Sequence, residues 1–143
     1  MNLSKIILAG VAFAAVSQLI HSLGATLTMG FYFDPAYFPV WSKVMMPGPG
    51  PPPASFYYYS IAFGLVNGIV LAFAFAIIRG GIPGRGLKKG LLFGLLVFLI
   101  ASLPSSLSLY LLINLPVALI IYWTVEGFVA CLIGGAIIGL LVK

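Results

Sequence analysis

Four long apolar stretches constrain the fold of this chain more than any other feature. They cover residues 3–28, 56–79, 87–112 and 115–142. About 20 consecutive apolar residues make a helix long enough to cross the hydrocarbon core of a bilayer. A helix also satisfies its own backbone hydrogen bonds, which lipid cannot do. The sequence therefore predicts an all-α fold, a polytopic membrane protein with a bundle of four transmembrane helices.

Composition supports this prediction and limits the number of domains. Of the 143 residues, 62% are hydrophobic and 6% are charged, whereas a soluble domain has about 25% charged residues. We expect one transmembrane domain over residues 1–143, with few residues left for a catalytic domain. The apolar stretch after Lys5 resembles a secretory signal, but it is longer than the roughly 7–15 apolar residues of a signal core. It is therefore expected to be the first helix.

The basic residues predict the orientation of the bundle. Four spans place six of them on one side, namely Lys5, Arg79, Arg85, Lys88, Lys89 and Lys143, and leave Lys43 on the other. Lysine and arginine are enriched in cytoplasmic segments. We therefore expect both termini in the cytoplasm, an outer loop at residues 29–55, and a bacterial inner membrane.

The same basic residues bear on the expected partners. The net charge of +5 does not indicate nucleic-acid binding, because the basic residues are few and are separated by apolar spans. We expect the partners to be the lipid bilayer and either other membrane subunits or further copies of this chain.

The outer loop combines aromatic residues with a proline-rich spacer. Aromatic residues gather at its two ends, as is typical of the membrane–water boundary. Residues 47–53 should be extended and semi-rigid, and a short helix is plausible at residues 35–46. The loop is either an aromatic belt with a spacer or a docking surface for a partner protein.

Proline, glycine and serine predict local features of the helices. Residues 80–84 and 114–116 form turns, and Pro104 is expected to kink the third helix. The serines around Pro104 should donate hydrogen bonds to preceding carbonyls. Glycines four residues apart should let helices approach closely; these packing positions are Gly64, Gly68, Gly90, Gly94, Gly135 and Gly139.

Glu126 is the only acidic residue inside an expected span. A charged carboxylate within a bilayer is costly, so it should face the bundle. Counting from the helix ends places Asn67 and Gln18 at a similar depth, with His21 about one turn nearer the outer surface. These four residues form either an interhelical hydrogen-bonding clamp or a site for a proton, an ion or a substrate.

No motif indicates an enzyme, a bound cofactor or a metal centre. Motifs of zinc proteases, serine hydrolases and phosphate-binding loops are absent from the sequence. The single histidine cannot supply both axial ligands of a haem within one subunit. Copper could use His21 with Met29, Met45 or Met46, because thioether and imidazole suit that metal. We expect instead that His21 hydrogen-bonds a neighbouring helix.

The second half of the chain resembles a group of small, uncharacterised bacterial four-helix membrane proteins. The resemblance rests on residues 80–84, residues 86–94, Leu115-Pro116, Trp123, Glu126-Gly127 and the spacing of Gly135 and Gly139. It implies the four-helix architecture and no particular activity.

Two functions are consistent with these features. The first is a non-enzymatic accessory or scaffold subunit of a larger membrane complex, which the small size and the small-residue stripes favour. The alternative is a small oligomeric transporter or channel that uses the polar layer of Glu126, Asn67 and Gln18.

Overall fold

Four apolar helices form the body of the molecule. The computed structural model describes residues 2–142, and within that range it contains helices and turns but no strand. The helices α1 (Leu3–Leu27), α3 (Ala54–Ile78) and α6 (Val117–Leu141) have 25 residues each. The fourth joins α4 (Gly86–Val97), a π turn (Phe98–Ser102) and α5 (Leu103–Leu112). All four are long and apolar enough to cross a membrane, as the sequence predicted.

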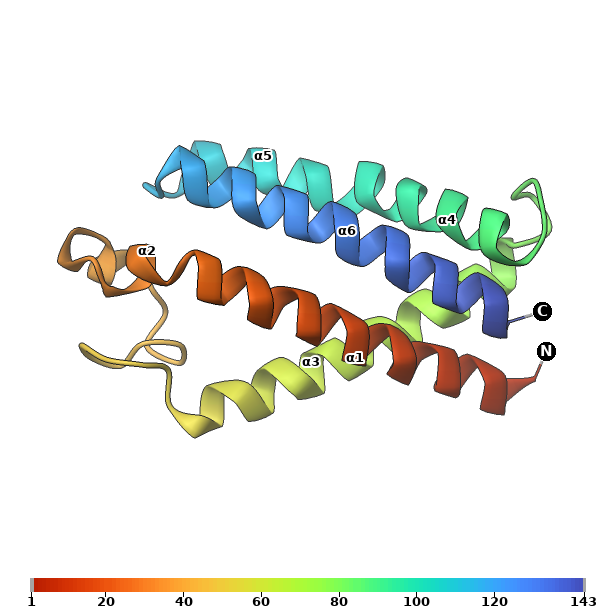
Figure 1. Cartoon of the computed structure of the whole chain (residues 1–143), viewed down its shortest axis with the longest axis horizontal. Coiled ribbons are helices and arrows are strands. Elements are labelled where there is room, and N and C mark those ends of the chain that lie inside the picture. The colour runs from red at the N-terminus through yellow and green to blue at the C-terminus, as the bar shows by residue number, and fades with distance from the viewer. Residues whose placement is uncertain (1, 143) are drawn as a thin grey trace.

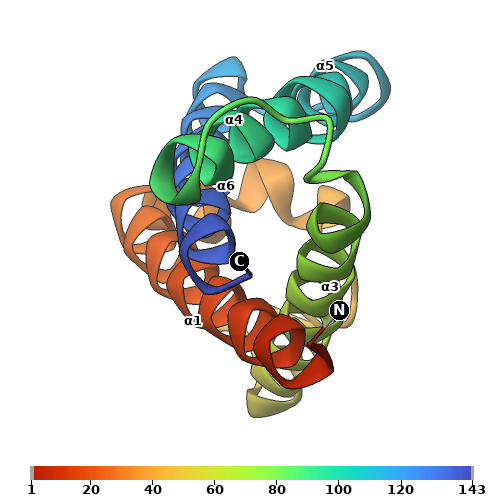
Figure 2. The same ribbon diagram turned by 90° about the vertical axis from the view of Figure 1, so that its right-hand side faces the viewer.

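The helices are arranged as two antiparallel pairs (Figures 1 and 2). In one pair α1 packs on α3, in the other α4 packs on α6, and contact between α1 and α6 joins the pairs. The helix α1 begins and α6 ends at the same end of the bundle, which is called the terminal end below. The segment between α1 and α3 lies at the opposite end, called the loop end. Lys143, which the charge argument places at the terminal end, lies outside the described residues.

The hydrophobic core is concentrated near the terminal end. It contains Ile6 and Phe13 of α1, Phe75 of α3, Phe93 of α4 and Ile138 of α6. The rings of Phe75 and Phe93 meet edge to face with their centroids 5.1 Å apart. Toward the loop end α3 diverges from α6, with which it makes little contact. Space is therefore left between α1, α3 and α6 at the loop end.

Glycines lie where helix backbones approach most closely. A Cβ atom on Gly68 would collide with the Gly10 carbonyl of α1, and one on Gly94 would collide with the Cys131 carbonyl of α6. Gly90, Gly135 and Gly139 lie in the same α4–α6 contact. Small residues let helices pack by van der Waals contact where lipid removes the hydrophobic driving force. Gly64 differs from the other expected packing positions, because a Cβ atom there would meet no atom within 4 Å.

The third span is irregular immediately before Pro104. Proline has no N–H to donate to the preceding turn, and the π turn at Phe98–Ser102 widens the helix at that point. Ser106 Oγ donates to the Ser102 carbonyl (3.1 Å) and Ser108 Oγ to the Pro104 carbonyl (2.9 Å). The expected serine-to-carbonyl bonds are confirmed for these two residues.

The loop end carries a short folded segment rather than an open loop. It contains α2 (Met29–Phe33) and a 3-10 helix, η1 (Pro35–Val40). Asp34 Oδ1 accepts from the Ala36 N–H at 2.9 Å and so caps η1. A hydrophobic cluster packs this segment against the beginning of α6, and its buried members are Trp41, Met46, Leu115, Leu119 and Ile120. The segment is therefore held over the space between the helices.

Candidate functional site: a polar cavity at the loop end

A cavity of about 500 Å³ lies between α1, α3 and α6 beneath the loop-end segment. Helix α1 contributes side chains from Gln18 to Thr26, which recur at helical spacing on one face. Helix α3 contributes Ser60 and α6 contributes Glu126, while prolines and methionines of the loop segment complete the wall. None of the lining residues is a lysine or an arginine. Glu126 is therefore the only aspartate, glutamate, lysine or arginine among the residues that line the cavity.

His21 and Glu126 form a pair across the contact between α1 and α6. His21 Nδ1 lies 3.1 Å from Glu126 Oε2, a hydrogen-bonding distance. The imidazole is 53% exposed, whereas the carboxylate is only 13% exposed. At about 1.5 Å per residue, Glu126 lies roughly 14 Å from the start of α6. The pair therefore places an accessible imidazole in front of a carboxylate buried within a span.

The other carboxylate oxygen of Glu126, Oε1, has a different environment from Oε2. It is buried and has no hydrogen-bond partner among the described residues. Burying a charged oxygen without compensation is costly, and buried polar groups in proteins are normally satisfied. Oε1 lies against Gly24 of α1, so this oxygen is an unsatisfied acceptor packed into the contact between α1 and α6, while the residue itself lines the cavity.

Gly24 makes the approach of Glu126 to α1 possible. A Cβ atom at this position would overlap the Glu126 carboxylate. Gly24 lies one turn after His21, so the two residues share a face of α1. Gly24 was not predicted from the sequence, because it does not recur at the four-residue spacing that marks packing glycines. The sequence feature that could have identified Gly24 is its position three residues after the only histidine, which places both on one face of a helix.

Gln18 belongs to the same cavity but contacts a different helix. Its Oε1 accepts from Ser60 Oγ of α3 at 3.2 Å. This bond joins α1 to α3 toward the loop end, where α3 has diverged from α6. Ser60 was not singled out from the sequence, since an isolated serine near a helix end carries little signal.

An aromatic contact closes the cavity at the loop end. Trp123 Nε1 of α6 donates to the Tyr32 hydroxyl of α2 at 3.1 Å. The Trp41 ring lies next to both, with centroid separations of 5.2 Å to Tyr32 and 6.3 Å to Trp123. The aromatic residues expected at the membrane boundary thus also hold the loop segment against α6.

Asn67 does not join the other polar residues. It is exposed on α3, and no hydrogen bond links its side chain to another described residue. Its neighbour Gly68 packs on Gly10, whereas Glu126 contacts α1 at His21. The eleven residues of α1 between those contacts correspond to about 16 Å. Counting from the helix ends misplaced Asn67 because α3 crosses α1 at an angle and Asn67 lies nearer the terminal end.

Methionines also gather at this cavity. Apart from Met1 the chain has three methionines, and Met29, Met45 and Met46 all line the wall together with His21. Within residues 2–142 no group of three or more histidine, cysteine or acidic side chains could hold a metal ion.

Comparison of the chain with protein-family models, with curated proteins and with solved structures finds no match in any of the three. The resemblance to small bacterial four-helix membrane proteins therefore stays a prediction.

Proposed function

We propose that this protein is a small transporter or channel that binds a cation beside Glu126 in the loop-end cavity. The observation that carries the proposal is the Glu126 carboxylate, which pairs with the half-exposed His21 imidazole and belongs to the wall of a cavity of about 500 Å³. An ionisable residue within a membrane span generally marks a path or site for an ion or a substrate. The wall has one carboxylate and no lysine or arginine, so a positive ligand would neutralise it.

The orientation that we propose follows from the basic residues. The terminal end carries Lys5 and the cluster from Arg79 to Lys89, whereas the loop segment has only Lys43. With the basic end in the cytoplasm, the cavity takes its ligand from the outer side of a bacterial inner membrane. Transport would then require α3 to move relative to α6, and the small contact between these helices favours such a movement.

Replacing Glu126 by glutamine tests the proposal. The amide keeps the shape and the hydrogen bond to His21 but removes the charge, so we expect cation affinity to fall at least tenfold while the fold is retained. Proton and sodium flux into vesicles and the fluorescence of bound ethidium, an aromatic cation, would measure this. The control is Asp34→Asn, which removes the same charge at the loop end and keeps the Oδ1 atom that caps η1.

The control also defines the result that would overturn the proposal. If no proton, sodium, copper(I) or ethidium binding or flux depends on Glu126, or if Asp34→Asn lowers it equally, the cavity is not a cation site.

Copper(I) is the particular cation that the composition of the wall favours. Because Glu126 engages His21 Nδ1, the Nε2 atom remains free for a metal, and a carboxylate behind a histidine is a common arrangement at metal sites. Thioethers are soft ligands that suit copper(I). We expect Met45→Leu with Met46→Leu, which conserves volume, to lower copper(I) affinity at least tenfold in competition with a chromophoric chelator. If the double variant binds copper(I) as tightly as the unmodified chain, the ligand is another cation.

An accessory or scaffold subunit, the first of the two functions that the sequence suggested, is here the second hypothesis. It is favoured by α5, in which no residue is buried within this chain and whose Leu111 and Leu112 are 80% and 81% exposed. A partner helix could cover this surface in place of lipid. Stable foreign subunits that co-purify in mild detergent, and that are lost when Leu111 and Leu112 are replaced by serine, would support it.

A further inference from the structure

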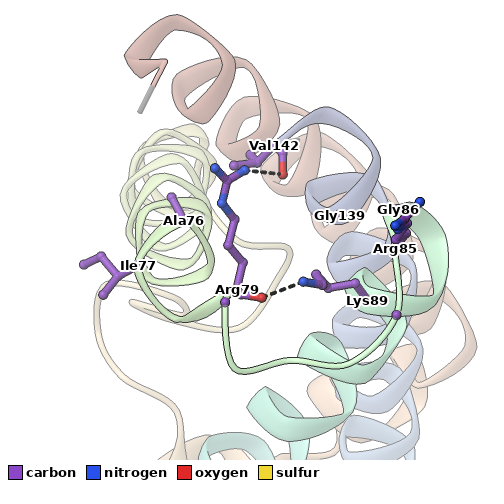
Figure 3. Close-up of a pocket in the computed structure, with 10 residues that line it drawn as sticks. Ala76, Ile77, Arg79, Arg85, Gly86, Lys89, Gly139 and Val142 are labelled. Carbon is purple, nitrogen blue, oxygen red and sulfur yellow. Dashed lines mark hydrogen bonds between the residues drawn. The ribbon is translucent and has the colours of Figure 1, made fainter.

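A second cavity, of about 650 Å³, lies at the terminal end of the bundle (Figure 3). It is enclosed by the end of α3, the turn at residues 79–85, the beginning of α4 and the end of α6. Three of its lining residues are basic, namely Arg79, Arg85 and Lys89. It shares no residue with the loop-end cavity, so whatever occupies it is independent of the function proposed above.

Two of the basic side chains are held in place by hydrogen bonds to backbone carbonyls. Arg79 donates through a guanidinium nitrogen to the Val142 carbonyl at 3.3 Å, and Lys89 Nζ donates to the Arg79 carbonyl at 2.6 Å (Figure 3). An arginine has five N–H donors and a lysine has three, so most of their donors remain available. The bonds thus fix two cationic groups at the cavity wall and leave them able to bind an anion.

No acidic side chain balances these charges. The sequence has two acidic residues. Asp34 lies in the loop segment, and Glu126 lies sixteen residues before Val142 in α6, or about 24 Å along the helix. The residues that line this cavity thus include three basic ones and no aspartate or glutamate, a lining that suits an anion, and phosphate is an anion that arginine and lysine bind in proteins.

The position of the cavity and its apolar wall indicate where the phosphate comes from. A helix of 25 residues is about 37 Å long, which exceeds the roughly 30 Å of a bilayer's hydrocarbon core. The ends of the spans therefore reach the headgroups. Ala76 and Ile77 form the α3 side of the cavity, and Ile77 is 64% exposed on the lipid-facing surface. An acyl chain could lie along α3 while its phosphate reaches the basic groups.

We infer that the terminal-end cavity is a binding site for an anionic phospholipid, with the phosphate held by Arg79 and Lys89 and with Arg85 adding positive charge at the edge of the cavity. Basic cavities between transmembrane helices have the chemistry to bind such headgroups. A bound lipid would bridge α3, α4 and α6 at the end where the pairs of helices meet. The site thus couples the stability of the bundle to the anionic lipid content of the membrane.

Arg85 and Lys88 provide a matched pair of variants for the test. Arg85 lines the cavity and takes part in neither carbonyl bond, so its removal leaves the wall intact. Lys88 is three residues away, carries the same charge and packs over Gly84 without lining the cavity. Neutralising either one changes the net charge of the terminal end equally.

The experiment measures lipid binding to the purified full-length chain in an uncharged detergent, by native mass spectrometry and by thermal unfolding. We expect phosphatidylglycerol to bind more tightly than phosphatidylcholine and to raise the melting temperature. A basic residue near a membrane surface contributes to the free energy of binding anionic lipid. Losing that contribution in Arg85→Gln should weaken phosphatidylglycerol binding about fivefold. Lys88→Gln should leave it within twofold, and Lys89→Gln should weaken it at least as much as Arg85→Gln.

Three results would overturn the inference. Equal affinity for the two lipids would exclude selection for the anionic headgroup. Equal losses in Arg85→Gln and Lys88→Gln would show that surface charge alone attracts the lipid. Binding of inorganic phosphate or glycerol 3-phosphate as tightly as phosphatidylglycerol would show that a soluble anion, and not a lipid, occupies the cavity.

Discussion

At the scale of single residues, the candidate site depends on how closely one carboxylate can approach another helix. Glu126 reaches His21 because Gly24 has no side chain in its path. The atoms that a Cβ on Gly24 would displace are the end of a flexible side chain, not backbone. The glycine therefore positions the carboxylate, and it matters less for holding the helices together.

Gly24→Ala separates these two roles. We expect the added methyl group to push the Glu126 carboxylate away from His21 and to lower cation affinity about as much as Glu126→Gln does. Because the carboxylate can rotate, the free energy of unfolding should change by less than about 1 kcal/mol. The control is Gly30→Ala, where a Cβ meets nothing within 4 Å and φ is negative. Unfolding in sodium dodecyl sulfate and ethidium fluorescence measure the two effects, and unchanged affinity in Gly24→Ala would contradict the assignment.

At the scale of the helices, close backbone contact holds each antiparallel pair together. The α1–α3 crossing occurs where Gly10 meets Gly68, and the α4–α6 contact runs along Gly90, Gly94, Gly135 and Gly139. Backbone atoms lie opposite these glycines, so no side-chain rotation could make room for a larger residue. These contacts also fix the angle at which α3 leaves α1, and hence the width of the loop-end cavity.

Gly68→Ala and Gly64→Ala form a matched test of this packing. The two glycines are one turn apart on α3, but only Gly68 has a neighbour within 4 Å. We expect Gly68→Ala to lower the free energy of unfolding by about 1–3 kcal/mol, which is typical of overpacking. Gly64→Ala should be neutral or should stabilise the chain by up to about 1 kcal/mol, because alanine favours helix. Equal effects in the denaturant titration would mean that α3 does not pack on α1 through Gly68.

At the scale of the whole molecule, the two ends of the bundle have different chemistry. The terminal end gathers basic side chains around a cavity whose described lining includes no aspartate or glutamate, whereas the loop end gathers aromatic rings, methionines and the two acidic residues. This asymmetry matches the distribution expected across a membrane, with basic residues in the cytoplasm. The two proposed sites lie toward opposite ends of the bundle.

Labelling of engineered cysteines tests the orientation. In a Cys131→Ala background, Ser55→Cys should react with a membrane-impermeant reagent in intact cells, because Ser55 is exposed at the loop end. Gly80→Cys should react only after the membrane is permeabilised, and a Cβ atom at Gly80 has open space around it. Reaction of Gly80→Cys in intact cells would reverse the proposed orientation.

Local properties of the sequence were enough to predict the elements of the fold. Four apolar stretches, each longer than a bilayer requires, predicted four helices whose observed bounds lie close to those expected. The break at residues 79–85 and the irregularity before Pro104 also followed from glycine and proline, because these residues act on the adjacent backbone. Glu126, His21 and Gln18 could be chosen as candidate site residues from the sequence alone, because polar side chains are rare in the apolar stretches.

Tertiary structure alone decided which faces of the helices meet. In a water-soluble bundle an apolar stripe indicates the inward face, but lipid tails are as apolar as the core, so these helices are apolar on all sides. Nothing local therefore distinguished Gly68, which packs on α1, from Gly64, which does not. Because α3 crosses α1 at an angle, Asn67 lies away from Glu126. Because of the way α1 is rotated about its axis, Gly24 and His21 face Glu126. Such tilts and rotations depend on the packing of helix pairs, and that packing involves residues far apart in the sequence.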